Sequence, residues 1–459
     1  MTEFAKNGLL PQSGLAWSRE CFLMCEGVPP RPTAGLGRRL LLGVLGLMIL
    51  ACDPLGLSSA TDKASEQFFN RLLSVFYPDR GQQQIVLLLL DDAFLLRHDL
   101  HWPLPYQEQA KVLARLLHYR PQAVFVDLLY SHDHSRANET PQVLANVFAR
   151  YTQQDIPVLL ASTGQTLPQT DQVDTLSALA AVTKPAVVQW DGQGERYPLT
   201  VTGRDGQPLS TPAYALYQEH CQRQQGCETR ELPVDAPPIA VQWGLHTADQ
   251  QPLLSNSQHC QLRSSALAET FQMVLSALFW RFSSPAALPC PYTLTLNAAE
   301  LETTLPEERA LLRSVLQGRL VLVGADITGA ADRIFSPVHG QIPAVYQHAM
   351  ALDNLLTLQT GYYRDPPNLG DTSLDLISVI GLCFAAAILA IALMRDQGWF
   401  IRTYLRTGLA LLLLIVTVLC YQLRLTPLNV VGLGLLSLTL FRHHLEARAE
   451  TRDHARQGE

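Results

Sequence analysis

Long apolar runs stand at both ends of the chain, and shorter apolar runs alternate with polar segments between them. The long runs cover residues 40–57, where Asp53 is the only charge, and residues 376–394, 407–423 and 426–441, which have none. A bilayer core takes about 20 apolar residues as a helix, with about 17 as the lower limit. The first three runs reach this length and the fourth is short. The pattern predicts four transmembrane helices, and whether the fourth fully spans stays open.

The middle of the chain has the pattern of an α/β domain. Continuous apolar runs rich in Leu, Val and Ile end at polar or turn residues, which is typical of strands buried on both faces of a sheet. Strands are predicted at residues 85–90, 123–126, 158–161, 186–190, 239–243 and 320–323, and helices at residues 106–119, 267–282 and 343–358. The alternation predicts a largely parallel or mixed sheet covered by helices. Residues 194–207 and 291–303 have the character of loop or hairpin insertions.

Basic residues give the orientation of the predicted helices, because cytoplasmic loops carry an excess of Lys and Arg. They precede the first run, lie between the second and third, and follow the fourth: Lys6, Arg19, Arg31, Arg38, Arg39; Arg395, Arg402, Arg406; Arg442, Arg448. These three zones share one side if there are four spans, and Arg424 on the other side is the exception. The pattern therefore predicts cytoplasmic N- and C-termini.

The first apolar run is interpreted as an uncleaved anchor. It starts about forty residues into the chain, whereas a secretory signal peptide normally lies within about the first 15–30 residues. The predicted organisation is a cytoplasmic leader (1–38), a transmembrane helix (39–58), a periplasmic α/β domain (59–370), three transmembrane helices (374–394, 407–423 and 426–441) and a cytoplasmic tail (442–459). We expect a multi-pass protein of the bacterial inner membrane, with the lipid bilayer as one partner.

Four cysteines fall in the predicted periplasmic domain, where an oxidising compartment favours disulfides. Cys221, Cys227, Cys260 and Cys290 allow three pairings. We favour Cys221 with Cys227, which closes a small loop and leaves Cys260 for Cys290. A zinc site is the alternative, but no C-x-x-C spacing supports it.

Several motifs in a fixed order carry a resemblance to a known family. They are Ile85-Val86-Leu87-Leu88-Leu89-Leu90-Asp91-Asp92, Trp102-Pro103-Leu104-Pro105 before a helix, Pro121-Gln122-Ala123-Val124-Phe125-Val126-Asp127, Gly318-Arg319-Leu320-Val321-Leu322-Val323-Gly324-Ala325, Asp332-Arg333-Ile334-Phe335-Ser336-Pro337 and the helix from Val345 to Leu356. Over about residues 67–358, this order resembles the type-2 CHASE domain, an extracellular sensor module. The layout of one helix, the domain and then three helices is similar to that family as well.

The resemblance implies a sensor whose output is a following cyclase, kinase or diguanylate cyclase domain. Here only residues 442–459 follow the last apolar run, too few for a catalytic domain, since single domains rarely stand below about 40–50 residues. We therefore expect no enzyme, but a sensor or scaffold that works through an envelope or cytoplasmic partner in an oligomer or complex. Stand-alone members of the family are often encoded beside FecR-domain proteins, which suggests that type of partner. The alternative is a structural subunit of a cell-envelope assembly.

The candidate ligand-binding residues are three aspartates and a tryptophan. Asp91, Asp92 and Asp127 directly follow predicted strands, where open α/β sheets bind ligands. Their carboxylates could hold a cation or a small polar ligand, and Trp102 could stack on one. In the alternative, each aspartate caps a helix or turn, and Trp102 packs in a rigid turn.

Other ligand classes find less support in the sequence. His132 and His134 form an H-x-H pair, but in a polar loop this pair is more often exposed than metal-binding. The turn after Gly324 lacks the Lys-Ser/Thr ending of a phosphate loop. A net charge of −7 without a basic tract argues against nucleic acid. We expect no metal, no cofactor and no catalytic residue.

Small residues on two of the predicted membrane helices permit close helix packing in lipid. Gly43 and Gly46 lie on the first helix, and Gly381 and Ala385 on the second. They could contact a partner, or they could serve packing within the chain's own bundle.

The predicted topology can be tested with reporter fusions. A reporter fused after Glu459 should be active only if it works in the cytoplasm, and one fused near Gln250 only if it works in the periplasm. A periplasmic C-terminus would show that the fourth span is wrong.

Overall fold

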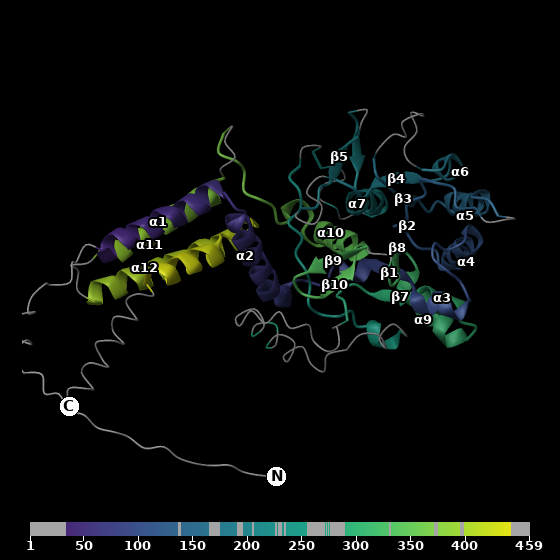
Figure 1. Ribbon diagram of the computed structural model, residues 1–459. Coiled ribbons are helices and arrows are strands. Elements are labelled where there is room, and N and C mark those ends of the chain that lie inside the picture. The colour runs from purple at the N-terminus through teal and green to yellow at the C-terminus, as the bar shows by residue number, and fades with distance from the viewer. Residues whose placement is uncertain are drawn as a thin grey trace, which may run out of the picture.

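The computed structural model consists of a helix bundle joined to an α/β domain (Figure 1). The structure describes residues 34–441, apart from residues 136–138, 165–174, 191–195, 204–205, 225–226, 228–231, 234–235, 255–270, 272, 274, 276–289, 330–331, 371–374 and 395–398. The predicted leader (almost entirely), the tail and Cys260 therefore lie outside the described residues, as does most of the predicted helix at residues 267–282.

A six-stranded parallel sheet forms the centre of the domain. Its strand order is β4-β3-β2-β8-β1-β7, with bounds β1 Ile85–Asp91, β2 Ala123–Val126, β3 Val158–Ser162, β4 Lys184–Val187, β7 Thr295–Asn297 and β8 Leu320–Asp326. Strand β8 lies between β1 and β2, so that Val321 is in register with Val86 on one side and Val124 on the other. The α/β class predicted for the domain, with its largely parallel sheet, is thereby confirmed.

Helices cover both faces of this sheet (Figure 1). One layer holds α3 (Asp92–Arg97), α4 (Tyr106–Leu117), α5 (Gln142–Gln153), α6 (Ser177–Ala180) and α9 (Pro306–Leu316), and the other holds α7 (Pro212–Arg223) and α10 (Val345–Leu358). Alternate strand residues enter the two cores: Val86 and Leu88 pack in the first, Ile85 and Leu87 in the second. Burial on both faces explains the continuous apolar runs of the sequence.

Two segments differ from their predicted roles. Residues 239–243 form no strand of the sheet: Ile239 makes an isolated bridge to Tyr197, and Trp243 packs with it in the core beside α7 and α10. Residues 291–303, interpreted as an insertion, supply the edge strand β7, parallel to β1. In β7 the polar Thr295 is buried by pairing with Gln251, so its Thr-Leu alternation does not look like a strand covered on both sides.

Two short hairpins complete the domain. Strands β5 (Thr200–Thr202) and β6 (Pro208–Ser210) pair antiparallel where the sequence predicted an insertion, and β9 (Arg333–Ser336) pairs with β10 (Gly340–Pro343). The favoured disulfide between Cys221 and Cys227 is present at the end of α7, with the two Cα atoms 5.6 Å apart. Cys290 is also disulfide-bonded.

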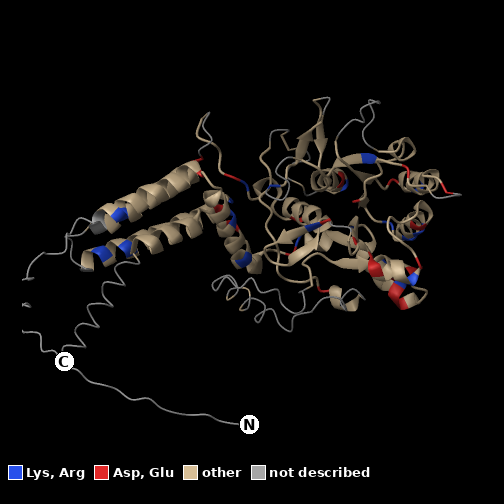
Figure 2. Cartoon of the chain, in the orientation of Figure 1, with Lys and Arg blue, Asp and Glu red and all other residues tan. Residues whose placement is uncertain are grey.

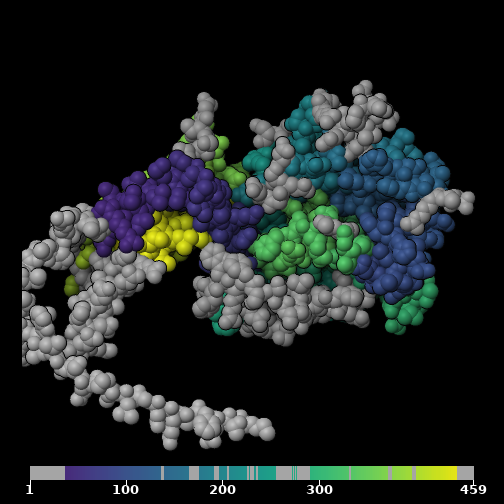
Figure 3. Space-filling model, in the orientation of Figure 1, coloured from purple at the N-terminus to yellow at the C-terminus, as the bar shows by residue number. Residues whose placement is uncertain are grey.

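Among the described residues, two helices are long and apolar enough to cross a membrane. They are α11 (Leu376–Leu393) and α12 (Trp399–Gln422). Helix α1 (Ala34–Cys52) meets α2 (Leu57–Leu73) at a bend of 76°, and this bent pair is a third candidate if it counts as one span. A shorter apolar helix covers Val430–Phe441. Side chains of α1, α11, α12 and this last helix share one apolar cluster, and Figure 3 shows the N-terminal helices packed against the C-terminal ones.

Helix α1 ends earlier than the sequence predicted, at Cys52 rather than near residue 57. Asp53 follows it with a positive φ of 43° and turns its carboxylate toward the start of α2. Its Oδ1 accepts a hydrogen bond from the Ser58 backbone N–H at 2.7 Å, and its Oδ2 accepts one from Ser59 at 3.2 Å. The single charge in the apolar run therefore marks where the helix ends and the chain bends.

The small residues of the membrane-type helices pack inside the bundle. A Cβ atom on Gly43 would lie 2.1 Å from the Leu389 side chain of α11, and one on Gly46 would lie 2.5 Å from Leu436. Ala385 is fully buried. Of the two roles considered for these residues, internal packing is the one that the structure shows.

The close contact between β8 and α10 gives a prediction about stability. A Cβ atom on Gly324 would lie 2.6 Å from Cγ1 and 2.8 Å from Cβ of Val345. Gly324→Ala should lower the free energy of unfolding of the domain by roughly 1–3 kcal/mol, because the helix must shift away from the sheet. Gly408→Ala, with no atom within 4 Å, is the control. Denaturant unfolding with equal stability for the Gly324 variant and the wild type would contradict this packing.

Candidate functional site

The predicted carboxylates at the end of β1 make local hydrogen bonds. Asp91 caps α3, its Oδ1 accepting from the Phe94 N–H at 2.8 Å. Asp92 accepts from Thr328, from the backbone N–H at 3.0 Å and from the hydroxyl at 2.5 Å. For these two residues the structure shows the capping and turn roles. Ligand binding by them stays a prediction.

Trp102 is half-buried and packs against the core layer that contains α4 and α5. In the loop after β2, His132 Nδ1 lies 3.0 Å from the Ser131 hydroxyl, and the His134 N–H donates to the Tyr106 hydroxyl. Within the described part of the chain, no group of three or more His, Cys, Asp or Glu side chains is arranged to hold a metal ion.

Asp127 faces the opposite layer and begins a buried polar chain. Its Oδ2 lies 4.0 Å from Nε2 of His348 on α10, and both side chains are less than a tenth exposed. His348 Nδ1 lies 2.8 Å from the Tyr197 hydroxyl, whose oxygen accepts from the Ala213 N–H at 3.1 Å. When the Tyr197 hydroxyl donates to Nδ1, the neutral imidazole carries its proton on Nε2, facing Asp127.

Burial keeps both ends of this contact neutral over a wide pH range. Desolvation raises the pKa of Asp127 to about 7, and nearby Asp332 adds to the shift. Desolvation lowers the pKa of His348 to about 3. Asp127 is therefore a buried carboxyl group that titrates near neutral pH.

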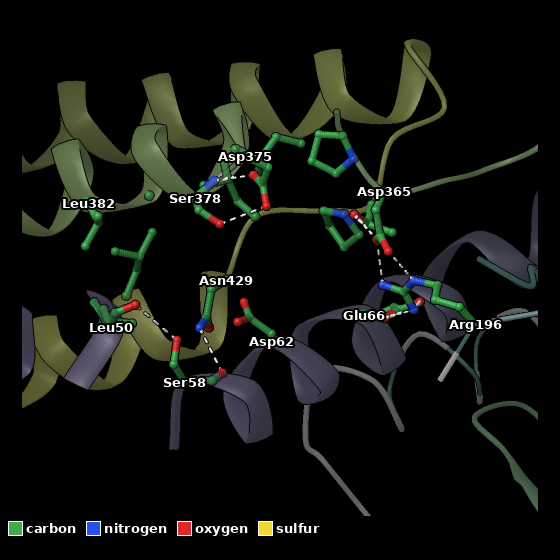
Figure 4. Close-up of a pocket in the computed structure, with 17 residues that line it drawn as sticks. Leu50, Ser58, Asp62, Glu66, Arg196, Asp365, Asp375, Ser378, Leu382 and Asn429 are labelled. Carbon is green, nitrogen blue, oxygen red and sulfur yellow. Dashed lines mark hydrogen bonds and ion pairs between the residues drawn. The ribbon is translucent and has the colours of Figure 1, made fainter. Parts of the chain in front are cut away.

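A second cluster of polar residues lies where the bundle meets the domain. A cavity of about 240 Å³ opens there between α2, α11 and the segment after α12 (Figure 4). Its polar lining comes from segments far apart in the sequence: Ser58, Asp62, Glu66, Arg196, Asp365, Asp375, Ser378 and Asn429. We call this cavity the junction pocket.

Arg196 holds both connections between domain and bundle at the edge of this pocket. Its Nη1 donates to both carboxylate oxygens of Glu66 on α2, each at 3.0 Å. Its Nε and Nη2 donate to the two oxygens of Asp365 at 2.7 and 2.8 Å, in the segment that leads to α11. The guanidinium fork fits this pairing because it presents several donors in one plane.

The turn between α12 and the last helix docks on the same segments. Thr426 donates its backbone N–H to the Arg364 carbonyl and its hydroxyl to Asp365, each at 3.0 Å. Asn429 donates to the Thr61 hydroxyl on α2 at 2.8 Å. The junction thus joins the entry to the domain, its exit and the end of α12.

Asp62 is a carboxylate of the junction pocket with a raised pKa. Burial raises its pKa to about 6, and the neighbouring charges of Asp375 and Asp53 add to the shift. Asp375 caps α11 through the Ser378 N–H at 2.7 Å. The sequence reasoning missed this cluster, although Glu66 and Asp365 flank the first and second apolar runs, which is the one hint available.

Comparison with protein families matches the domain together with the helices on either side of it. The model of the CHASE2 domain matches residues 41–394, which is most of the chain. The chain belongs to the CHASE2 domain family. The match confirms the resemblance to the type-2 CHASE domain and extends it from within α1 to the end of α11. No curated protein and no solved structure matches the chain.

Membership gives the α/β domain its general role. CHASE2 is an extracellular sensor domain, and two helices of the described chain could span a membrane. The junction pocket therefore lies where a CHASE2 sensor domain meets membrane-type helices, and Arg196 is the residue that holds the two connections together.

The raised pKa of Asp127 predicts a pH-dependent effect of removing its charge. Because the folded-state pKa exceeds the unfolded value, ionisation of Asp127 costs stability as pH rises from about 4 to 7, and the cost is complete above that. The stability of Asp127→Asn relative to wild type should therefore increase by roughly 2 kcal/mol when the pH is raised from 5 to 8. Thermal unfolding at both pH values measures this, and Asp99→Asn at an exposed turn is the control. An equal difference at both pH values would show that Asp127 is not buried as a neutral acid.

Proposed function

We propose that this CHASE2 protein is an inner-membrane sensor that passes changes in its periplasmic domain to its membrane helices, and through them to another protein. The observation that carries the proposal is the double pairing of Arg196 with Glu66 and Asp365. A change that moves the loop of Arg196 would pull on α2 and on the segment before α11 together. We call α2 and the segment before α11 the two tethers of the domain. Rigid pairing at both tethers suits transmission of a movement to the membrane helices better than a flexible linker would.

The membrane arrangement proposed here has four spans. Helices α11 and α12 have the length and composition of spans, and α1 and the helix Val430–Phe441 share their apolar cluster. Figure 2 supports the orientation: Lys and Arg gather at the bundle ends of α1 and α12 that point away from the domain. Basic residues on that side favour the cytoplasm. Both termini are then cytoplasmic and the domain periplasmic.

The partner is proposed to be an envelope or cytoplasmic protein, of the FecR-domain type suggested by the family resemblance, held in an oligomer or complex. The chain carries no G-x-S-x-G or H-E-x-x-H motif, which supports output through a partner. A structural role in an envelope assembly is the alternative, and it does not require the domain to move its tethers.

The decisive variant is Arg196→Gln, which removes the charge-assisted hydrogen bonds to both carboxylates and leaves the fold's core untouched. Such bonds are worth about 1.5–3 kcal/mol each. Amide hydrogen exchange in α2 should become at least about tenfold faster, which corresponds to ~1.4 kcal/mol of local stability. The exposed Arg80, replaced by Gln, is the matched control.

The same two variants test the partner. Tagged protein is purified in detergent from native membranes, and co-purifying proteins are identified by mass spectrometry. Recovery of the partner should fall several-fold for Arg196→Gln and stay unchanged for Arg80→Gln. Equal recovery despite faster exchange in α2 would contradict signalling through the tethers. Wild-type protein that reproducibly recovers nothing would contradict output through a partner.

A further inference from the structure

An apolar cavity of about 180 Å³ lies between α2 and the end of α12 nearest the domain. Its walls are formed mainly by Phe69, Leu72 and Leu73 of α2 and by Leu414, Val418 and Tyr421 of α12. It is separate in character from the junction pocket, because its surface is almost entirely carbon. We call it the α2–α12 cavity.

The α2–α12 cavity is continuous with the outward surface of α12. Leu414 and Val418, which line it, are 58% and 49% exposed. Only 6% of the candidate span Phe400–Gln422 is buried inside the molecule. In the membrane placement proposed above, this surface faces lipid. What reaches the cavity from that side is therefore hydrocarbon.

Helix α2 forms one wall of the cavity, facing α12. The bend of 76° turns it away from the direction of α1, so that it crosses the end of the bundle (Figure 1). Phe69 and Leu73 line the cavity, and so does Glu66, which lies earlier on the same face of α2 and whose carboxylate is paired with Arg196. An apolar stretch that ends at a paired charge suits a helix at the boundary between lipid and water.

We propose that the α2–α12 cavity binds one acyl chain of a phospholipid from the leaflet next to the domain. The proposal rests on the membrane placement in the proposed function. The cavity is smaller than the roughly 300–1,000 Å³ that hold a whole drug-sized ligand, so it suits a stretch of a linear chain. Tyr363 and Tyr421 also line the cavity, and their ring centroids lie 5.7 Å apart. Tyrosine is enriched at the headgroup level of membranes.

A bound chain would connect the lipid to the sensor's tether. It would touch α2, which carries Glu66, and α12, whose following turn binds Asp365 through Thr426. The lipid would then fill the gap beside the Arg196 contacts and steady the angle of α2 against the bundle.

The test is photo-cross-linking of the full chain in vesicles of phosphatidylethanolamine and phosphatidylglycerol that contain a phosphatidylcholine with a diazirine in one acyl chain. Cross-linked residues are mapped by mass spectrometry. Bulk lipid reaches the outward side chains of α12, such as Leu411, which is 59% exposed. A chain inside the cavity reaches Phe69, Leu72 and Leu73, the half-buried side chains of α2 that line it. We expect cross-links at both places.

Two variants fill the cavity from opposite walls. Thr417→Trp acts from α12 and Leu73→Trp from α2, and both positions line the cavity. Each should reduce cross-linking at Phe69 and Leu72 several-fold and leave the outward face of α12 labelled. The control is Leu411→Trp, on the same helix but outside the cavity, which should leave the labelling of α2 unchanged. Two filling variants keep the test valid if one of them does not fold.

The outcomes separate the two proposals. Labelling of outward α12 without any labelling of α2 would overturn the acyl-chain site while the membrane placement stands. Labelling of α2 that persists at the wild-type level in both filling variants would also overturn it, because the lipid would then lie outside the cavity. Absence of labelling on both helices would overturn the membrane placement, and the acyl-chain site with it.

Discussion

The chain enters and leaves its α/β domain at one place, and a single guanidinium group binds both connecting segments, α2 and the segment before α11. Arg196 projects from the domain and pairs with Glu66 just after the first bend and with Asp365 before α11. The arginine and glutamate side chains are about three quarters buried. A charge in such a place is costly unless paired, so the two carboxylates and the arginine depend on one another. This contact fixes α2 against the segment before α11 beside the junction pocket, together with the hydrogen bonds from Asn429 to Thr61 and from the Val431 N–H to Ser65.

Helix α10 connects this junction with the core of the domain through polar side chains. It is buried along most of its length, yet it bears His348, Asp353 and Asn354. His348 faces Asp127 at the end of β2, and Asp353 accepts a hydrogen bond from Tyr77 at 2.7 Å. Tyr77 follows α2, and the segment after α10 leads to Asp365. The sheet is thus linked to α2 and to the segment before α11 through polar side chains of one buried helix, while Gly324 lets that helix pack closely on β8.

The sequence was most informative where local pattern and burial agree. The strand at residues 85–90 follows from an uninterrupted apolar run, and its sheet is covered by helices on both faces. It was least informative at β7. There Thr295 is buried because the Gln251 side chain forms hydrogen bonds with its backbone N–H and its carbonyl oxygen. Residues 239–243 show the opposite case: Ile239 and Trp243 are buried, but in the core beside α7 and α10 and not in a strand of the sheet. Apolar character predicts burial, and it does not say which neighbour provides it.

By itself the sequence determined the α/β class, the ordered motifs of the CHASE2 family and the apolar runs at both ends, and it favoured the Cys221–Cys227 pairing. Each of these rests on residues close together in the chain or on a pattern read along it. Only the tertiary structure decided that Arg196 meets Glu66 and Asp365, which are 130 and 169 residues away. It also decided that Asp91 serves as a helix cap, while Asp127 is a buried acid with its pKa raised to about 7. The physical reason is that pairing and desolvation depend on what surrounds a charge in space, and neighbours along the chain do not record that.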